Sequence, residues 1–198
     1  LLLSVLFFIF NLQSWTNADD IRDFQIEGMS VGDSLLNYVN KSKINNSRKY
    51  EYNDDKFYTI DLILDSFENY FGVQIHLKKN DQKYQIYGIG GAITFGEPGE
   101  YFPQSENDCK KQMNIIEKDV DNIFLNADKQ SAQAVGQGDY DPDAVRDEIY
   151  YTIENGHIYL QCVTWGKIRK KKDYLYDSLR LTLLSQEFFN WIENKAYN

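Results

Sequence analysis

Residues 145–165 read VRDEIYYTIENGHIYLQCVTW, and this stretch carries the strongest hairpin signal of the chain. Valine, isoleucine, threonine and aromatic residues are frequent on both sides of Asn155-Gly156, a composition typical of strands. Asn-Gly is the strongest short signal for a two-residue hairpin, because a type I′ turn needs positive φ at both positions. We therefore predict an antiparallel hairpin formed by strands at 145–154 and 157–165.

Downstream of this hairpin, the pattern predicts a loop, a strand and a helix. Residues 166–172 are mostly cationic and are interpreted as a basic loop. Residues 174–184 carry a leucine at every second position near their end, which predicts a third strand. Ser185 is a suitable N-cap for a final amphipathic helix that reaches residue 195.

Upstream of the hairpin, residues 105–125 give the clearest helical pattern. Their apolar side chains recur on one stripe, and Lys, Glu and Asp occupy the opposite side. The following stretch, 126–144, is rich in Gly, Gln, Asp and Ala and is interpreted as a loop.

The first part of the chain repeats the same order of elements. A short helix is predicted at 30–39, and strands are predicted at 57–64, 73–77 and 84–95. Three glycines in the last of these strands indicate a bulge or a close approach of another segment.

The predicted fold class is α+β, with two α-β-β-β units whose mainly antiparallel sheet is covered on one face by helices. The two units, 26–100 and 105–198, suggest an internal duplication within a single α+β domain at 19–198. One six-stranded sheet without duplication is the alternative.

The composition of the 198 residues excludes several classes of protein. Hydrophobic residues make up 42% of the chain, enough for a core, and two cysteines are too few for a disulfide-dense scaffold or a Cys₄ zinc site. The net charge of −9 argues against a nucleic-acid partner, because such binding depends on neutralising phosphates.

The first 18 residues have the pattern of a secretory signal peptide. LLLSVLFFIF at 1–10 is apolar, and NLQSWTNA at 11–18 ends with small residues at the expected cleavage positions. We therefore expect 1–18 to be removed and residues 19–198 to form a periplasmic or secreted protein. The mature chain has no apolar run of membrane-spanning length, so no transmembrane segment is expected in it.

The two cysteines are predicted to form a disulfide. Cys109 lies on the apolar stripe of the predicted helix, and Cys162 lies on the same strand face as Ile158 and Leu160, so both point to a shared core. An oxidising compartment favours a bridge between them. Two buried, reduced thiols are the alternative.

Few residues suggest catalysis or metal binding, and we assign no catalytic residue, metal ligand or cofactor. His76 and His157 are interpreted as solvated surface residues. The acidic stretch 139–148 resembles a calcium loop but lacks the Gly and Glu that an EF-hand requires. A hydrolase with an unrecognised site, using Asp139, Asp141 or His157, remains an alternative.

Two groups of residues are candidates for binding. The basic loop could meet an anionic membrane surface or an acidic partner, although a solvated loop is the simpler interpretation. Its cations are Lys167, Arg169, Lys170, Lys171 and Lys172. The aromatic residues Tyr84, Tyr87 and Trp165 are candidates for binding a small molecule or a glycan.

Two stretches carry resemblances to known families. IEGMSVGDSLL at 26–36 and WIENKAY at 191–197 resemble an uncharacterised family of exported proteins from AT-rich marine alphaproteobacteria, which implies export and no particular activity. Residues 26–95, with Gly28-Met29-Ser30 before a helix and three strands, resemble outer-membrane assembly lipoproteins of the SmpA/OmlA type. Those proteins carry a lipidated Cys after the signal segment, and this chain has none at that place.

The leading functional hypothesis is a non-enzymatic periplasmic protein that binds another protein of the cell envelope. A binder of small molecules or glycans is the second hypothesis, and a hydrolase is the third. The sequence leaves the oligomeric state open.

Overall fold

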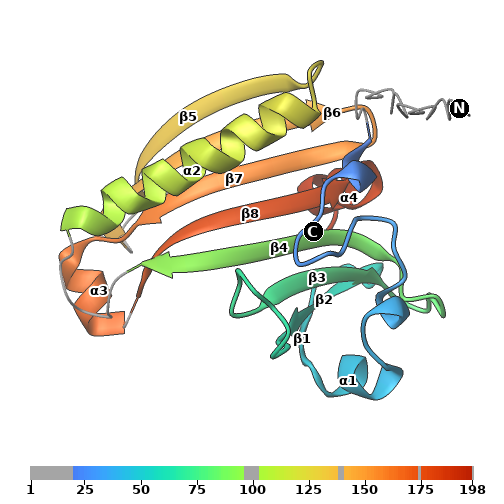
Figure 1. Ribbon diagram of the computed structural model, residues 1–198. Helices are drawn as coiled ribbons and strands as arrows, with labels where there is room; N and C mark the ends of the chain where they lie inside the picture. The colour runs from blue at the N-terminus through green and yellow to red at the C-terminus, as the bar shows by residue number, and fades with distance from the viewer. Residues whose placement is uncertain (1–19, 96–102, 138–140, 174, 198) are drawn as a thin grey trace, which may run out of the picture.

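The computed structural model describes residues 20–95, 103–137, 141–173 and 175–197, and they form one eight-stranded antiparallel sheet with helices packed against it (Figure 1). The strands are β1 (Arg48–Glu51), β2 (Phe57–Leu62), β3 (Val73–Lys78), β4 (Ile86–Phe95), β5 (Asp128–Gln137), β6 (Asp141–Ile153), β7 (Gly156–Thr164) and β8 (Asp177–Ser185). The helices are α1 (Lys41–Asn46), α2 (Pro103–Ile123), α3 (Lys167–Asp173) and α4 (Gln186–Asn194), with 3₁₀ turns η1 (Ile21–Asp23) and η2 (Leu35–Asn37).

The sheet consists of two four-stranded meanders that meet at their last strands. The strand order is β1-β2-β3-β4-β8-β7-β6-β5. The seam is the antiparallel pair of β4 and β8, which aligns every residue from Gly88 to Phe95 with a partner between Leu184 and Asp177. Each meander therefore contributes one edge strand, β1 or β5, to the complete sheet.

The α+β content is as expected, but the prediction of two α-β-β-β units is wrong. Each half contributes four strands, and all eight belong to one sheet rather than to two separate units. The two additional strands are β1 and much of β5, which are exposed on both sides. A strand that is exposed to solvent on both faces shows no alternation of apolar and polar residues, so its sequence pattern resembles that of a loop.

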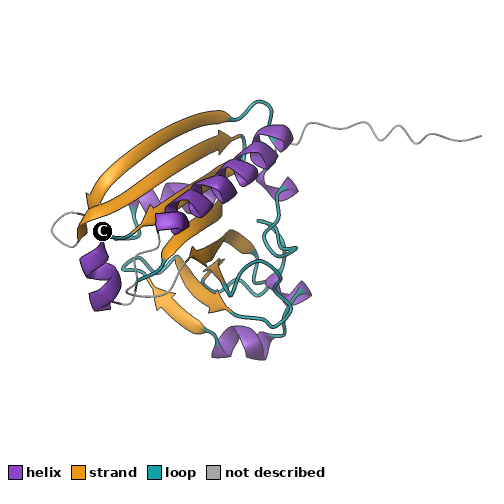
Figure 2. Cartoon of the chain, turned by 60° about the vertical axis from the view of Figure 1, so that its left-hand side comes forward, coloured by secondary structure: helices purple, strands orange, loops and turns teal. Residues whose placement is uncertain are grey.

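One face of the sheet holds the main core. Helix α2 lies across β4, β7 and β8 on this face (Figure 2). Residues 20–39 contribute further buried side chains beside it, including Ile26, Met29 and Leu35. The core side chains of β8 are Leu179, Leu181 and Leu183.

Helix α4 covers part of the opposite face, so the prediction that helices cover only one face is also wrong. Its Phe188 and Trp191 pack with Phe57 and Leu184 in a second buried cluster. Leu183 and Leu184 are consecutive residues of β8 and belong to different clusters, as the alternation of side chains along a strand requires. Ser185 caps α4 by accepting a hydrogen bond from the backbone N–H of Phe188, as predicted.

The hairpin that the sequence indicates is present, but its turn differs from the predicted type. Ile153 pairs with Gly156, so the loop residues are Glu154 and Asn155, and neither of them nor Gly156 has positive φ. Glycine is required at position 156 for a different reason, because β8 leaves no room for a side chain there. A Cβ at this position would lie 2.4 Å from the carbonyl oxygen of Leu184 on β8.

Three other segments differ from the predictions. The stretch 126–144 contains β5 and the start of β6, although it was expected to be a loop. The expected basic loop at 166–172 is largely helix α3. The helix expected at 30–39 is reduced to η2, and the next residues form α1.

The predicted disulfide between Cys109 and Cys162 is confirmed. It joins α2 to β7, with the two Cα atoms 5.8 Å apart, and both residues are buried in the main core. The bond closes a sequence separation of 53 residues and therefore ties the helix to the centre of the sheet.

Removing the disulfide should destabilise the protein by about 4 kcal/mol, because the unfolded chain regains the entropy of an open loop of this length. We expect urea unfolding of the double variant Cys109→Ala/Cys162→Ala to show this loss. Wild-type protein under reducing conditions should lose a similar amount, while reductant should leave the double variant unchanged. A double variant as stable as the oxidised wild type would contradict the expected contribution of the bond.

Candidate functional site

The candidate site begins where β3 is shorter than its neighbour β4. The last paired residues of β3 and β4 on this side are Val73 and Gly91. Strand β4 runs on beside β8 as far as Phe95 (Figure 1). Among the described residues, no strand pairs with the other edge of 92–95.

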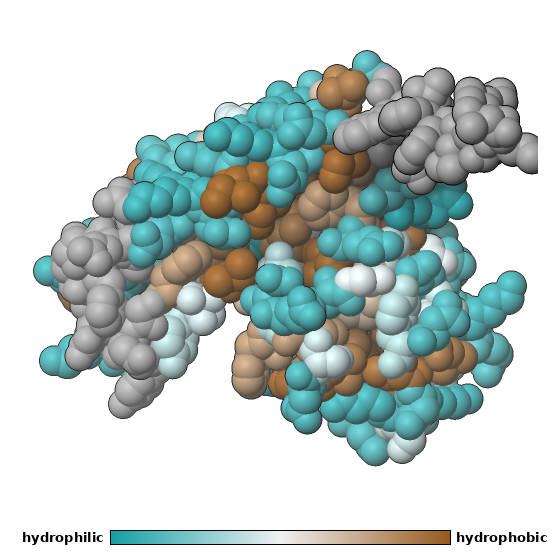
Figure 3. Space-filling view, viewed as in Figure 1, coloured by the Kyte–Doolittle hydropathy of each residue, from teal (hydrophilic) through white to brown (hydrophobic). Residues whose placement is uncertain are grey.

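A hollow of about 460 Å³ lies beside this edge, and we call it the β4 groove. Figure 3 shows the molecule hollowed between the part that carries α2 and the part built from β1 to β3, with apolar side chains along the hollow. The lining comes from β4 and β8, from the ends of β2 and β3, and from the loop between those two strands. Its residues are Asp61, Ile63, Phe71, Gly72, Val73, Gln74, Gly90, Gly91, Ala92, Thr94, Arg180 and Thr182.

Small residues of β4 keep the floor of the groove low. A Cβ at Gly90 would lie 3.0 Å from the hydroxyl oxygen of Thr182, whereas one at Gly91, on the core face of the strand, would lie 2.5 Å from the ring of Tyr70. A Cβ at Gly88 would lie 2.7 Å from His76. The glycines therefore allow close approach, as their sequence pattern indicated, and a register shift between His76 and Leu77 adds the expected irregularity.

The loop 65–72 forms one wall of the groove, and a single carboxylate holds it in place. Glu27 accepts hydrogen bonds from the backbone N–H groups of Glu68, Asn69 and Tyr70 at 2.9, 2.7 and 3.0 Å. Burial by itself raises the pKa of Glu27, but these donors outweigh it and lower the pKa below its ordinary value. The wall is thus anchored to the N-terminal segment.

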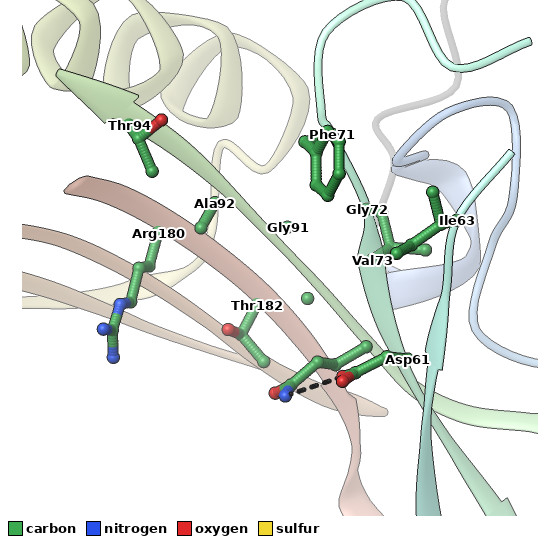
Figure 4. Close-up of a pocket in the computed structure, with 12 residues that line it drawn as sticks. Asp61, Ile63, Phe71, Gly72, Val73, Gly91, Ala92, Thr94, Arg180 and Thr182 are labelled. Atoms are coloured by element: carbon green, nitrogen blue, oxygen red, sulfur yellow. Dashed lines mark hydrogen bonds between the residues drawn. The ribbon is translucent and has the colours of Figure 1, made fainter. Parts of the chain in front are cut away.

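Phe71 and Ile63 give this wall an exposed apolar surface. Phe71 is 85% exposed and Ile63 is 45% exposed, and Figure 4 shows the Phe71 ring standing over the strand that carries Gly91. Ile63 also lines a second depression beside Tyr38 and Leu64, so the apolar surface continues around the edge of the sheet. Exposed apolar side chains that adjoin in this way are typical of interaction surfaces.

The two ends of the groove carry opposite charges. Asp61 accepts a hydrogen bond from the hydroxyl of Tyr50 at 2.5 Å. It accepts another from the amide of Gln74 at 3.2 Å (Figure 4). Arg180 points away from the other end, and its Nε–H donates to the Ser178 hydroxyl over 3.4 Å. The groove can therefore satisfy a ligand that has both polar and apolar parts.

The three aromatic residues proposed for ligand binding are not brought together. Tyr84 packs at the margin of the main core, whereas Tyr87 packs against Phe57 in the cluster on the opposite face. The backbone N–H of Trp165 donates to Asp177 at 2.9 Å, in a third place. These residues do not form one aromatic site.

The segment proposed as a basic binding loop forms α3, and its cations fall into two groups. Some form ion pairs within the structure, and the others are exposed on the surface of the helix. Lys170 is buried and donates to Asp177, which is also buried, over 2.5 Å. Arg169 pairs with Asp173 at 3.1 Å. Lys167, Lys171 and Lys172 remain on the exposed side of the helix.

The residues proposed for a hydrolase are far apart where they are described. Asp141 opens β6 and accepts a hydrogen bond from the backbone N–H of Gly166, whereas His157 pairs with Thr152 near the other end of the strand. Eleven residues of strand separate the two positions, which is roughly 35 Å. Asp139 lies outside the described residues, as does the predicted signal peptide at 1–18.

The histidines are not the solvated surface groups that we expected. His76 stacks on Phe188 of α4 at 4.4 Å between ring centroids, and burial lowers the pKa of His76 to about 4. His157 lies 3.7 Å from the ring of Phe189, and burial lowers its pKa as well. Both rings therefore help to seat α4 on the sheet.

The described residues contain neither a cluster of metal ligands nor a helix suited to cross a membrane. None of the described His, Cys, Asp and Glu side chains form a group of three or more placed to hold a metal ion, the 141–148 part of the acidic stretch included. Within the same residues, no helix combines the length and apolar character needed to cross a membrane.

Comparison of the chain with known protein families, with curated proteins and with solved structures found no match. The resemblances drawn from 26–36, 26–95 and 191–197 therefore stay predictions.

The β4 groove itself could not be identified from the sequence. Its glycines gave a signal for close approach, but the unequal ends of β3 and β4 depend on where the loop 65–72 leaves the sheet. Arg180 appeared only as an alternating polar residue of a strand.

We expect Lys170→Ala to destabilise the protein by roughly 3–5 kcal/mol, because it leaves the Asp177 carboxylate buried without its cation. Lys171→Ala is the matched control, since Lys171 is the next residue of the same helix and is exposed. Its free energy of unfolding should stay within about 0.5 kcal/mol of the wild type. Chemical denaturation of the two variants makes the comparison, and equal stability would show that the buried ion pair is dispensable.

Proposed function

We propose that this protein is a non-enzymatic interaction module that binds an extended segment of another protein along the edge of β4. The observation that carries the proposal is the length of β4, which continues to Phe95 while β3 begins at Val73 opposite Gly91. An unpaired strand edge presents backbone donors and acceptors that an added strand can satisfy.

The dimensions of the edge suit a short recognition motif. Residues 92–95 extend over roughly 13 Å at the usual rise of a strand, so about four residues of a partner could pair there. Backbone hydrogen bonds would supply affinity without regard to sequence. Side chains that enter the groove would then supply selectivity.

The groove favours a partner segment with an apolar anchor. Phe71 and Ile63 are exposed at the wall, and the Gly90–Ala92 floor leaves room below them. Aromatic and aliphatic side chains that fill such pockets often contribute most of the binding energy in an interface.

We further propose that the protein is exported through cleavage of the segment 1–18 and that its partner belongs to the cell envelope. The apolar segment followed by small residues supports export. The Cys109–Cys162 disulfide is compatible with an oxidising compartment such as the periplasm.

A second candidate function is the binding of a small molecule in the same groove. Its volume of about 460 Å³ falls within the range of ligand pockets, and its lining combines apolar walls with a few polar groups. A small ligand would occupy the floor without pairing with the backbone of 92–95, and this difference separates the two candidates.

The proposal can be tested with short linear peptides selected from a random library on the wild-type protein. We expect Ala92→Leu, which places a larger side chain in the groove, and Phe71→Ser, which removes the exposed ring, to weaken binding of the selected peptides about tenfold or more, or roughly 1.4 kcal/mol. Fluorescence polarisation of labelled peptides would measure the dissociation constants.

Val135→Ser is the matched control, because Val135 is 71% exposed but lies on β5 at the other edge of the sheet. Its peptide affinity should equal that of the wild type, and all three variants should keep the wild-type circular dichroism spectrum. Selected peptides whose binding is unaffected by both groove variants would place the interaction elsewhere and refute the proposal.

A further inference from the structure

A polar row crosses the uncovered part of the sheet next to the β4 groove. The strand register aligns Ala132, Glu148, Gln161, Arg180 and Ala92 from β5 to β4, all on the face that α4 covers only at its other end. Small residues stand at both ends of the row and longer polar side chains stand in its middle. The long side chains in the middle of the row therefore rise above the alanine side chains at its two ends.

A second arginine lies on the same face, in the neighbouring row. Arg146 of β6 aligns with Val163, which aligns with Ser178 of β8, and Ser178 is two residues from Arg180. The strands of Arg146 and Arg180 are two places apart, or about 10 Å across the sheet. Burial lowers the pKa of Arg180, and the positive charge of Arg146 lowers it further.

Glu148, the carboxylate in the row of Arg180, does not satisfy both cations. Glu148 accepts hydrogen bonds from the Tyr150 hydroxyl at 2.5 Å and from the Gln161 amide at 2.9 Å. It approaches the Nε atom of Arg146 only to 3.8 Å. Burial and, after it, the hydrogen bond to Glu148 raise the pKa of the Tyr150 hydroxyl to about 12, and this bond already engages the carboxylate.

The donor groups of the arginines are correspondingly short of acceptors. Nε of Arg146 is buried and has no hydrogen-bond partner among the described residues. In the described part of the chain, Nε of Arg180 reaches only the Ser178 hydroxyl, at 3.4 Å. Among the described side chains of these two rows, two cations and one carboxylate leave an excess of one positive charge on an otherwise acidic protein.

We propose that Arg146 and Arg180 form a binding site for an oxyanion, a carboxylate or a phosphate group, on the open sheet face beside the β4 groove. A guanidinium group presents several N–H donors in a plane and binds both kinds of oxyanion through paired hydrogen bonds. Ser178 is buried and its hydroxyl already accepts from Nε of Arg180, so the two guanidinium groups themselves supply the donors of the site.

The position of the site also bears on the partner segment. Arg180 lines one end of the groove and points away from it, so an acidic side chain or a C-terminal carboxylate would reach the guanidinium group where a bound strand runs past that end. This extension rests on the proposed function, whereas the oxyanion site itself does not.

The test is a titration of the folded protein with inorganic phosphate and, separately, with acetate, at constant ionic strength. The side-chain Nε–H signals of the five arginines are followed by nuclear magnetic resonance. We expect the signals of Arg146 and Arg180 to shift and saturate in at least one titration, while those of Arg22, Arg48 and Arg169 stay nearly constant. The titration that saturates identifies the preferred oxyanion.

Variants make the test specific. Arg180→Gln should weaken oxyanion binding at the remaining Arg146 signal at least tenfold, and Arg48→Gln, which removes the same charge from β1, should leave it unchanged. The melting temperature of Arg180→Gln should equal or exceed that of the wild type, because the substitution relieves repulsion between like charges. A large fall in melting temperature would show that Arg180 is a structural residue and overturn the proposal.

Two other outcomes would also overturn the oxyanion site. In the first, all five arginine signals shift together without saturation, which reports a general attraction of anions to the protein. In the second, no arginine signal shifts, which means that neither anion binds. If either occurs while library peptides still bind in the groove, the strand-binding proposal survives alone. If the arginine signals saturate but no groove-dependent peptide is found, the oxyanion site is supported and the strand-binding proposal is refuted.

Discussion

The pairing of β4 with β8 is the interaction on which the rest of this structure depends. It joins two meanders, each with an exposed outer strand, into one sheet with its apolar residues at the centre. Because α2 and α4 both contact β4, β7 and β8 from opposite faces, each helix covers the seam rather than one meander alone. The disulfide between α2 and β7 strengthens the same region. Without the seam, neither helix would have a complete surface to bury.

The seam also explains why a groove exists. Strand β4 must be long enough to match β8 as far as Phe95, whereas β3 has only to match β2, which ends at Leu62. The excess length of β4 leaves an edge without a strand partner among the described residues. Glu27 holds the loop 65–72 beside that edge, and Arg180 projects from the strand on the other side. The candidate binding surfaces thus follow from unequal strand lengths.

The sequence predicted the elements with strong periodicity and missed those without it. The central strands, α2 and α4 follow their apolar patterns, and the disulfide follows from placing Cys109 and Cys162 on facing apolar surfaces. Strand β5 was missed because a polar edge strand has no buried face. The cationic run of α3 was misread because the buried pairing of Lys170 with Asp177 depends on a residue beyond that run. The groove was not predictable, because it depends on the relative ends of β3 and β4, which local patterns do not specify.

Strand binding requires that the outer edge of β4 be open between residues 92 and 95 in the free protein. Residue-resolved amide hydrogen exchange measures whether this edge is open. Alternate amides of this stretch point to β8 or to the open edge, so we expect alternating slow and fast exchange there, in contrast to uniform protection of Gly88–Gly91 between β3 and β8. Uniformly slow exchange across 92–95 would show that the edge is already covered in the free protein, and it would contradict the account.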